Sequence, residues 1–317
     1  MPRAIVASLG LLLLALVSLF VGVADLRPSD LWSDPQAGWL LMVSRVPRTL
    51  AALITGAALA VAGLIMQMLA RNRFVEPSTA GTGQSAALGI VLVTLLAPGA
   101  SIATKMLVAT LTALVGTAGF LAIVRRLPVH QPLMVPLAGL VYGGVIGAAV
   151  TFLAYQADLL QYLGIWISGE FSGVLRGRYE LLWIAAILAV LAYLAADQFT
   201  ILGLGREMSL NLGLSYSQIL IVGLIIISVV TALSVVTVGM IPFVGLVVPN
   251  IIARLMGDNL RATLPYVALL GAGLVLACDL IGRVIRHPYE VPVGTVFGVL
   301  GAVIFLYLLY RRPRHAR

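Results

Sequence analysis

Residues 45–67 read Arg-Val-Pro-Arg-Thr-Leu-Ala-Ala-Leu-Ile-Thr-Gly-Ala-Ala-Leu-Ala-Val-Ala-Gly-Leu-Ile-Met-Gln, and after Arg48 this stretch has no charged side chain. A helix needs about 20 apolar residues to cross the hydrocarbon core of a bilayer. Gly56, Ala60 and Gly63 follow one another at helical spacing, and such small-residue faces let helix backbones approach closely. The stretch therefore predicts a membrane-spanning helix that begins beside two arginines and packs tightly against its neighbours.

The rest of the chain has the same apolar character. Of its 317 residues, 61% are hydrophobic and 10% are charged, whereas an average soluble domain is about 45–50% apolar and about 25% charged. Lipid is therefore expected to be its main solvent. The single cysteine, Cys278, excludes a disulfide within the chain, and the histidines at 130, 287 and 315 are too far apart in sequence to suggest a metal motif. The net charge of +8 fits arginines at helix ends near the membrane surface better than nucleic-acid binding.

Ten stretches are candidates for membrane-spanning helices: 4–24, 49–70, 79–97, 104–124, 133–155, 181–199, 217–238, 243–256, 263–282 and 293–310. The first could instead be a secretory signal peptide, although its apolar run exceeds the usual core of about 7–15 residues. The eighth is short and contains Pro249, so we expect it to be buried among other helices. Residues 156–178 predict a loop with a short interfacial helix. The fold class we expect is an all-α integral membrane protein, with a single transmembrane domain over residues 1–317.

An even number of spans places both termini on the same side, and basic residues favour the cytoplasm. With cytoplasmic termini, twelve basic residues lie in inner segments: Arg3, Arg71, Arg73, Arg125, Arg126, Arg206, Arg254, Arg261, Arg311, Arg312, Arg314 and Arg317. Eight lie in outer segments: Arg27, Arg45, Arg48, Lys105, Arg176, Arg178, Arg283 and Arg286. The bias supports this orientation, mainly through the basic tail, but the outer charges require an explanation.

The sequence motifs do not support catalysis, because no nucleophile elbow, His-Glu-x-x-His or Walker-type phosphate loop occurs. Ion-coupled transport usually requires an ionisable group near the bilayer midplane, and Asp279 is the best candidate. Arg283 lies four residues later on the same helix face, so an ion pair is the simpler explanation. The middle of the membrane is otherwise expected to be nearly free of charge, which favours a machine that is powered from outside rather than by protons.

Three motifs, in order between about residues 40 and 310, resemble those of the permease family that imports iron–siderophore complexes, heme and cobalamin. They are the stretch 45–67 with the following Arg71-Asn72 and Glu76-Pro77, then Gly239-Met-Ile-Pro-Phe-Val-Gly-Leu-Val-Val-Pro249, then Asp279, Arg283 and Glu290-Val-Pro-Val-Gly294. Asn250 stands where many members carry histidine. The form of residues 71–84 resembles a subgroup that handles ferric siderophores, often catecholates, and in which two different permeases pair.

The resemblance implies the permease subunit of an ATP-binding cassette importer, a multi-pass protein of the bacterial inner membrane. Two permeases would bind two cytoplasmic ATPase subunits, which carry ATP and Mg²⁺, and this chain would need no cofactor. A periplasmic or lipid-anchored binding protein would deliver the ferric siderophore. Arg45, Arg48 and Arg283 match positions that dock its acidic side chains. Exposed arginines suit that role and would explain the outer charges, the alternative being contact with lipid phosphates.

Two further sets of residues take roles from the resemblance. The inner loop of about residues 203–216 is similar to the short coupling helices that contact the ATPase, with Arg206, Glu207, Leu212 and Gly213 as contact candidates; a plain amphipathic connector is the alternative. The fifth and tenth helices of the family line the path between two permeases. They would place Gly139, Gly143, Gly147, Gly294 and Gly298 at that interface, although packing within one chain explains such glycines equally well.

Several readings stay open on the sequence alone. A heme or cobalamin permease of the same family is one alternative, and an ion-coupled secondary transporter is another from a different class. The coupling-loop pattern and the scarcity of midplane acids favour the importer. The identity of the siderophore, and whether the second permease is identical or a paralogue, cannot be read from these residues.

Overall fold

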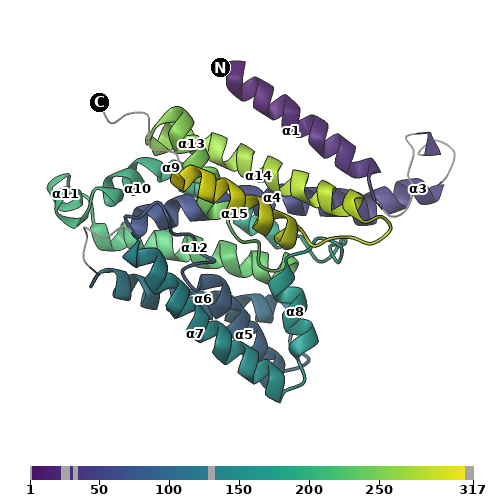
Figure 1. Cartoon of the computed structure of the whole chain (residues 1–317), viewed down its shortest axis with the longest axis horizontal. Coiled ribbons are helices and arrows are strands. Elements are labelled where there is room, and N and C mark those ends of the chain that lie inside the picture. The colour runs from purple at the N-terminus through teal and green to yellow at the C-terminus, as the bar shows by residue number, and fades with distance from the viewer. Residues whose placement is uncertain (1, 23–28, 31–34, 128–132, 311–317) are drawn as a thin grey trace.

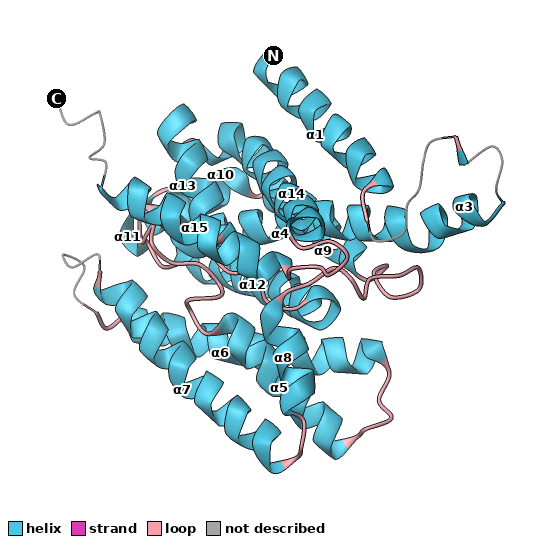
Figure 2. Cartoon of the chain, turned by 45° about the vertical axis from the view of Figure 1, so that its right-hand side comes forward, coloured by secondary structure: helices cyan, strands magenta, loops and turns pink. Residues whose placement is uncertain are grey.

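The computed structural model describes residues 2–22, 29–30, 35–127 and 133–310. Within these ranges the chain forms helices and loops but no strand, as expected for the all-α class (Figure 2). The basic tail 311–317, Arg27, His130 and His315 lie outside the described residues. The contribution of the tail to the charge bias therefore stays a prediction.

The helices follow the apolar stretches of the sequence closely. They are α1 (Pro2–Phe20), α3 (Pro35–Leu40), the π-helix η1 (Leu41–Arg45), α4 (Val46–Leu69), α5 (Thr82–Leu96), α6 (Ile102–Val124), α7 (Met134–Gln156), α8 (Leu160–Ser168), α9 (Leu182–Leu194), α10 (Ala196–Gly203), α11 (Arg206–Asn211), α12 (Tyr216–Val238), α13 (Val244–Met256), α14 (Leu260–Ile285) and α15 (Val293–Tyr310).

Six of the described helical segments are long and apolar enough to cross a membrane: Gln36–Leu69, Ile102–Val124, Met134–Gln156, Tyr216–Val238, Leu260–Ile285 and Val293–Tyr310. The pair α9 and α10 passes the same test together but is bent by 67°. Three shorter apolar helices, Ile5–Phe20, Thr82–Leu96 and Val244–Met256, account for the other predicted ranges. Among the described residues, six helices, or seven with the bent pair counted as one span, are long enough to cross a membrane, so the ten predicted spans are not confirmed by length alone.

Helix α4, which contains the sequence quoted first, lies at the centre of the molecule, and 83% of its most apolar window is buried (Figure 1). Its small-residue face packs against the backbones of other helices, as predicted. A Cβ atom added to Gly56 would lie 2.4 Å from the carbonyl oxygen of Gly271 in α14. One added to Gly63 would lie 2.1 Å from the Cα atom of Gly245 in α13. The backbones of α4, α13 and α14 therefore touch, and only glycine fits at these crossings.

Helix α13 is short and buried, as the sequence predicted for residues 243–256. Its 13 residues span about 20 Å at 1.5 Å per residue, which is less than the roughly 30 Å hydrocarbon core. It starts after Phe243, whose φ of +67° places a bulky side chain in the left-handed region. At least one end of α13 must therefore find hydrogen-bond partners within the protein rather than in water.

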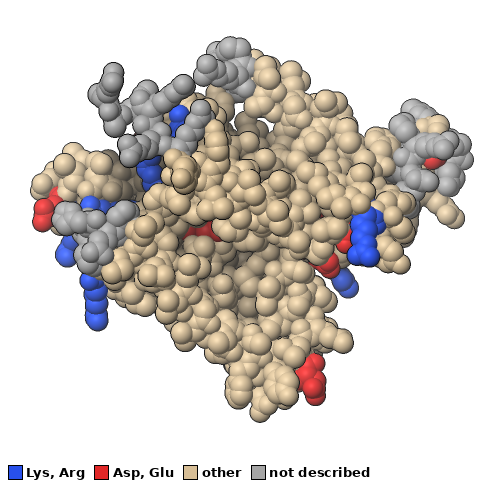
Figure 3. All heavy atoms as spheres, viewed as in Figure 1, with Lys and Arg blue, Asp and Glu red and all other residues tan. Residues whose placement is uncertain are grey.

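Helices α5, α6 and α7 form a second layer, and the short α8 predicted within residues 156–178 joins it to the rest of the molecule (Figure 1). The nitrogen of Met240 donates to the carbonyl oxygen of Trp166 in α8 over 2.9 Å. Most of the face shown in Figure 3 is uncharged, with charged side chains mainly toward two ends. That distribution is typical of a protein whose middle is in contact with lipid.

Candidate functional site

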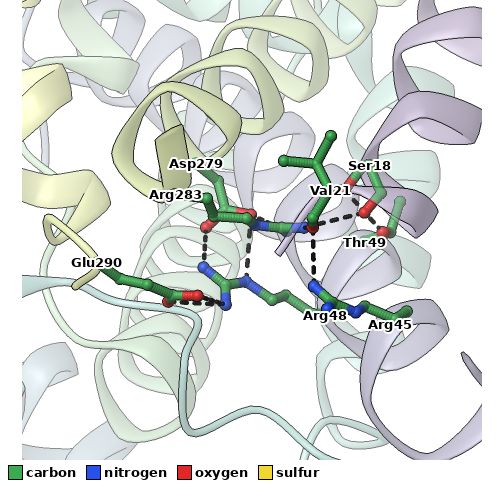
Figure 4. Close-up of polar contacts among 8 residues, drawn as sticks. All are labelled: Ser18, Val21, Arg45, Arg48, Thr49, Asp279, Arg283 and Glu290. Carbon is green, nitrogen blue, oxygen red and sulfur yellow. Dashed lines mark hydrogen bonds and ion pairs between the residues drawn. The ribbon is translucent and has the colours of Figure 1, made fainter. Parts of the chain in front are cut away.

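Three arginines and two acids meet at the end of the molecule where α4 begins and α14 ends (Figure 4). Arg45 is the last residue of η1 and Arg48 lies in the first turn of α4, while Asp279 and Arg283 lie in the last turns of α14. Glu290 comes from the loop between α14 and α15. We call these five residues the arginine cluster.

Arg48 binds both acids of the arginine cluster. Its Nη2 lies 2.7 Å from Oδ1 of Asp279 and its Nε lies 3.3 Å from Oδ2. Its Nη1 donates to both carboxylate oxygens of Glu290, over 2.9 and 2.8 Å. Every nitrogen of the Arg48 guanidinium is thus paired with a carboxylate, the strongest kind of protein hydrogen bond.

The other two arginines bind the end of α1. Nη1 of Arg283 donates to the carbonyl oxygens of Ser18 and Val21, each over 2.9 Å, and Nη1 of Arg45 donates to Val21 over 2.7 Å (Figure 4). The last carbonyls of a helix lack partners within it and carry partial negative charge, so cations stabilise them. Nη2 of Arg283 also pairs with Asp279. The predicted ion pair between residues 279 and 283 is therefore confirmed.

The structure corrects one expectation about charge. Arg45, Arg48 and Arg283 were expected to be exposed, but they are only 5%, 8% and 2% exposed. Their guanidiniums are used inside the chain, and this internal pairing accounts for three of the basic residues at that end. Asp279, the acid that the sequence singled out as the best candidate for ion coupling, is likewise buried, at 3% exposed in the last turns of α14. Charges can be buried here because each has an opposite charge or a helix end beside it.

Sequence reasoning missed a second buried acid, Glu76, in the connection from α4 to α5. Glu76 is 2% exposed. Its Oε1 accepts hydrogen bonds from the nitrogen of Phe243 over 2.7 Å and from Oγ of Ser78 over 2.5 Å. Phe243 directly precedes α13, so the carboxylate occupies the positive end of that helix. The available signal was an acid within a loop that leads to α5, a helix too short to span the membrane.

The four predicted coupling residues lie together at the opposite end of the molecule. Two short helices, α10 and α11, form this corner; Arg206 and Glu207 begin α11 and are exposed. Leu212 is 56% exposed, and Gly213 has a φ of +77°, which turns the chain into α12. Further exposed apolar side chains surround them: Leu204, Met208 and Leu210. We call these seven residues the corner surface.

The glycines predicted at the permease interface are packed within the chain to different extents. A Cβ atom on Gly139 would lie 2.5 Å from the carbonyl oxygen of Thr79, and one on Gly143 would lie 3.2 Å from Gly81, while Gly147 faces Gln84. Gly294 packs against Ser168, and Gly298 faces Pro242. Gly139, Gly143 and Gly294 are thus tightly packed within the chain, so the alternative of packing within one chain applies to them. Gly147 and Gly298 are only partly covered, and their place at the contact with a second permease stays a prediction.

The exposed sides of the same two helices are apolar. On α7 they carry side chains between 56% and 67% exposed: Leu137, Leu140, Val141, Val145, Phe152 and Tyr155. On α15 they carry Val299, Val303, Leu306 and Tyr307, between 55% and 63% exposed. Among the described residues, no group of three or more histidine, cysteine, aspartate or glutamate side chains is placed to hold a metal ion.

Comparison with known proteins agrees with the motifs. A sequence model of the FecCD transport family matches residues 10–311. The petrobactin import system permease protein YclN of Bacillus subtilis is 45% identical over 307 residues, which cover 96% of this chain and 97% of the relative. The ferric-anguibactin transport system permease protein FatD of Vibrio anguillarum is 40% identical, with 94% and 95% covered. A solved inward-facing structure of a metal-chelate type ABC transporter has the same fold, with a TM-score of 0.83 over 98% of this chain and 99% of that one, at 24% identity.

Proposed function

This chain belongs to the FecCD transport family, and we propose from that premise that it is the membrane permease of an ATP-driven importer for a ferric siderophore of the catecholate type. The observation that carries the proposal is the 45% identity to a petrobactin import permease over nearly the whole of both chains. Identity to the vitamin B12 permease BtuC of Serratia proteamaculans is lower, at 35%. The siderophore assignment is therefore favoured over cobalamin.

The chain crosses the membrane ten times in this proposal. The bent pair α9 and α10 counts as one crossing, and α1, α5 and α13 are shortened crossings. The end with α11 faces the cytoplasm, because the arginines there whose side chains are described are all exposed: Arg71, Arg73, Arg125, Arg126, Arg206, Arg254 and Arg261. At the other end, three of the seven described basic residues are buried in the arginine cluster. Exposed positive charge thus favours cytoplasmic termini.

The corner surface is the contact for the ATPase in this proposal. Four exposed leucine and methionine side chains beside one arginine and one glutamate form an apolar patch with a polar rim, which is the usual composition of a protein interface. Its position on two short helices, α10 and α11, lets a partner on the cytoplasmic side move the ends of α9 and α12. ATP and Mg²⁺ would be held by that partner.

The exposed apolar sides of α7 and α15 form the contact with the second permease and line the path between the two. A mostly apolar path suits transport, because a site that bound a bulky ferric siderophore tightly would retain it. The binding protein docks at the opposite end, at the arginine cluster. Arg48 is the arginine to which the binding protein docks. Arg45 and Arg283 act as positioning residues, because they donate hydrogen bonds to the carbonyl oxygens at the end of α1.

An ion-coupled secondary transporter is disfavoured by the geometry of Asp279. Both of its carboxylate oxygens accept hydrogen bonds from arginines, whereas a proton carrier needs an acid that can bind and release a proton during the cycle. Asp279 therefore fits a structural role better than a coupling role.

The test is purification of the chain from its native membrane in mild detergent, with mass spectrometry of proteins bound in stoichiometric amount, followed by uptake of iron-labelled siderophore into proteoliposomes. We expect an ATPase subunit to be recovered and uptake to require ATP inside the reconstituted system. Recovery of the chain alone, with uptake that is insensitive to ATP and abolished by collapse of the proton gradient, would refute the importer. A second permease in the preparation would identify a heterodimer.

A further inference from the structure

The two acids of the arginine cluster are held very differently. Asp279 lies on a rigid helix, its side chain is 3% exposed, and it is bonded to both Arg48 and Arg283. Glu290 lies in the loop 286–292, its side chain is 20% exposed, and among the described residues it pairs only with Nη1 of Arg48. Glu290 is therefore the acid of the arginine cluster that is in contact with water and has the fewest bonds.

Arg48 presents two separate binding edges to these acids (Figure 4). The edge formed by Nε and Nη2 is filled by Asp279, and Nη1 is filled by Glu290. If the side chain of Glu290 moved away, Arg48 would remain paired with Asp279. Its Nη1 would then be available to another carboxylate that approached from the water-exposed side on which Glu290 lies. Such an exchange replaces one charged hydrogen-bond acceptor with another, so the buried arginine is never left without its second partner.

We propose that Glu290 is an internal stand-in for an acidic side chain of the substrate-binding protein, and that docking exchanges one carboxylate for the other at Arg48. This inference rests on the proposed function, because it takes the docking partner from it. The structure favours this occupant on charge: the arginine cluster holds three cations and two anions, and its one water-facing site is already shaped around a carboxylate. In the permease without its partner, Glu290 thus occupies the docking position on Nη1 of Arg48.

The exchange has a direct route to the transport path. Beyond Glu290, the nitrogen of Val291 donates to the carbonyl oxygen of Gly282 in α14, and the nitrogen of Gly294 in α15 donates to Gly169 at the end of α8, each over 2.9 Å. The loop 286–292 thus connects the last turn of α14 to the first turn of α15. Release of Glu290 removes the side-chain contact that fixes this loop to α4, so docking at Arg48 would free the entrance of α15 to move.

The first experiment measures docking of the substrate-binding protein that is recovered with this chain, on permease–ATPase complexes in lipid nanodiscs. The wild type is compared with Glu290→Gln, which keeps the shape of the side chain and removes its charge. Because the internal acid competes with the partner, the apparent Kd of docking equals the intrinsic Kd divided by the fraction of time that Arg48 is free of Glu290. We expect docking to become about tenfold tighter in Glu290→Gln, the effect of an internal pair that is closed about nine-tenths of the time.

The matched control is Asp158→Asn, which removes one exposed acid from the turn between α7 and α8. Asp158 has a φ of +56°, a backbone conformation that asparagine also adopts readily, so the fold is preserved. Docking of this variant should equal that of the wild type. Equal tightening in both variants would show a general charge effect and overturn the exchange, as would an unchanged or weaker affinity for Glu290→Gln.

The second experiment follows the loop itself without changing Glu290. Tyr289 is 70% exposed, so Tyr289→Cys can be labelled with an environment-sensitive fluorophore after the buried Cys278 is replaced by alanine. Docking should shift the emission of this label, and an unchanged emission at saturating binding protein would overturn the inference even if Glu290→Gln does not fold. Absence of any docking to the wild type would instead refute the proposed function.

Discussion

Replacing Asp279 by asparagine should destabilise the chain far more than replacing Glu290 by glutamine, although each change removes one negative charge from the arginine cluster. The side chain of Arg283 is 0% exposed and that of Asp279 is 3% exposed. Among the described residues Arg283 has no other acidic partner, so Asp279→Asn leaves a buried guanidinium without a counter-charge. Breaking a buried ion pair in this way costs about 3–5 kcal/mol. Arg48 retains Asp279 when Glu290 is neutralised, and that partly exposed pair contributes about 1 kcal/mol.

The assay is thermal unfolding of both variants and the wild type, purified in the same detergent and heated at the same rate, since unfolding of membrane proteins is seldom reversible. For large chains one kcal/mol corresponds to about 2–4 °C. We expect Asp279→Asn to lower the melting temperature by about 10 °C, and Glu290→Gln by a few degrees at most (about 1 kcal/mol). Equal shifts would refute the assignment of Asp279 as the structural acid. An Asp279→Asn protein with wild-type stability and no transport would instead revive the ion-coupled alternative.

Three further outcomes are expected. Gly63→Ala should lower the melting temperature, because the new Cβ would lie 2.1 Å from the α13 backbone and overpacking costs about 1–3 kcal/mol; Gly144→Ala, with no atom within 4 Å of its Cβ, is the control that should be neutral or stabilising. Glu76→Ala should cost about 1–3 kcal/mol in the same assay by leaving a buried backbone N–H without an acceptor, and Glu76→Gln should cost less. Leu210→Glu on the corner surface should reduce recovery of the ATPase without changing the melting temperature, and unchanged recovery would contradict that contact.

Local patterns predicted the helices well because their signal lies within a short stretch of sequence. The run of apolar residues after Arg48 determines α4, and the glycine spacing at 56 and 63 identifies the face on which other backbones pack. The shortness of residues 243–256 was enough to predict that α13 is buried. Each of these properties depends on residues close together in the chain, and lipid imposes the same requirement on all of them: backbone polar groups must be paired within the helix.

Burial of the arginine cluster could not be predicted in this way. Arg48 and Asp279 are 231 positions apart, and an arginine near a helix end looks the same in sequence whether it faces water or a buried acid. A related argument applies to the glycines of α7. Their spacing shows that some backbone lies close to Gly139 and Gly143, but it cannot show whether that backbone belongs to the same chain.

The position of α4 links the two ends of the molecule that are proposed to bind different partners. Its first turn contributes Arg48 to the arginine cluster, and its last turn places Met68 beside Gly203 of α10, where a Cβ atom would lie 2.9 Å from the sulfur. A helix of 24 residues is about 36 Å long, and its backbone contacts with α13 and α14 leave it little freedom to bend. A partner that altered the position of Arg48 would therefore act on the α10–α11 corner through a nearly rigid element. Coupling between two binding sites is reciprocal. The factor by which docking of the binding protein changes the affinity for the ATPase therefore equals the factor by which the ATPase changes the docking affinity.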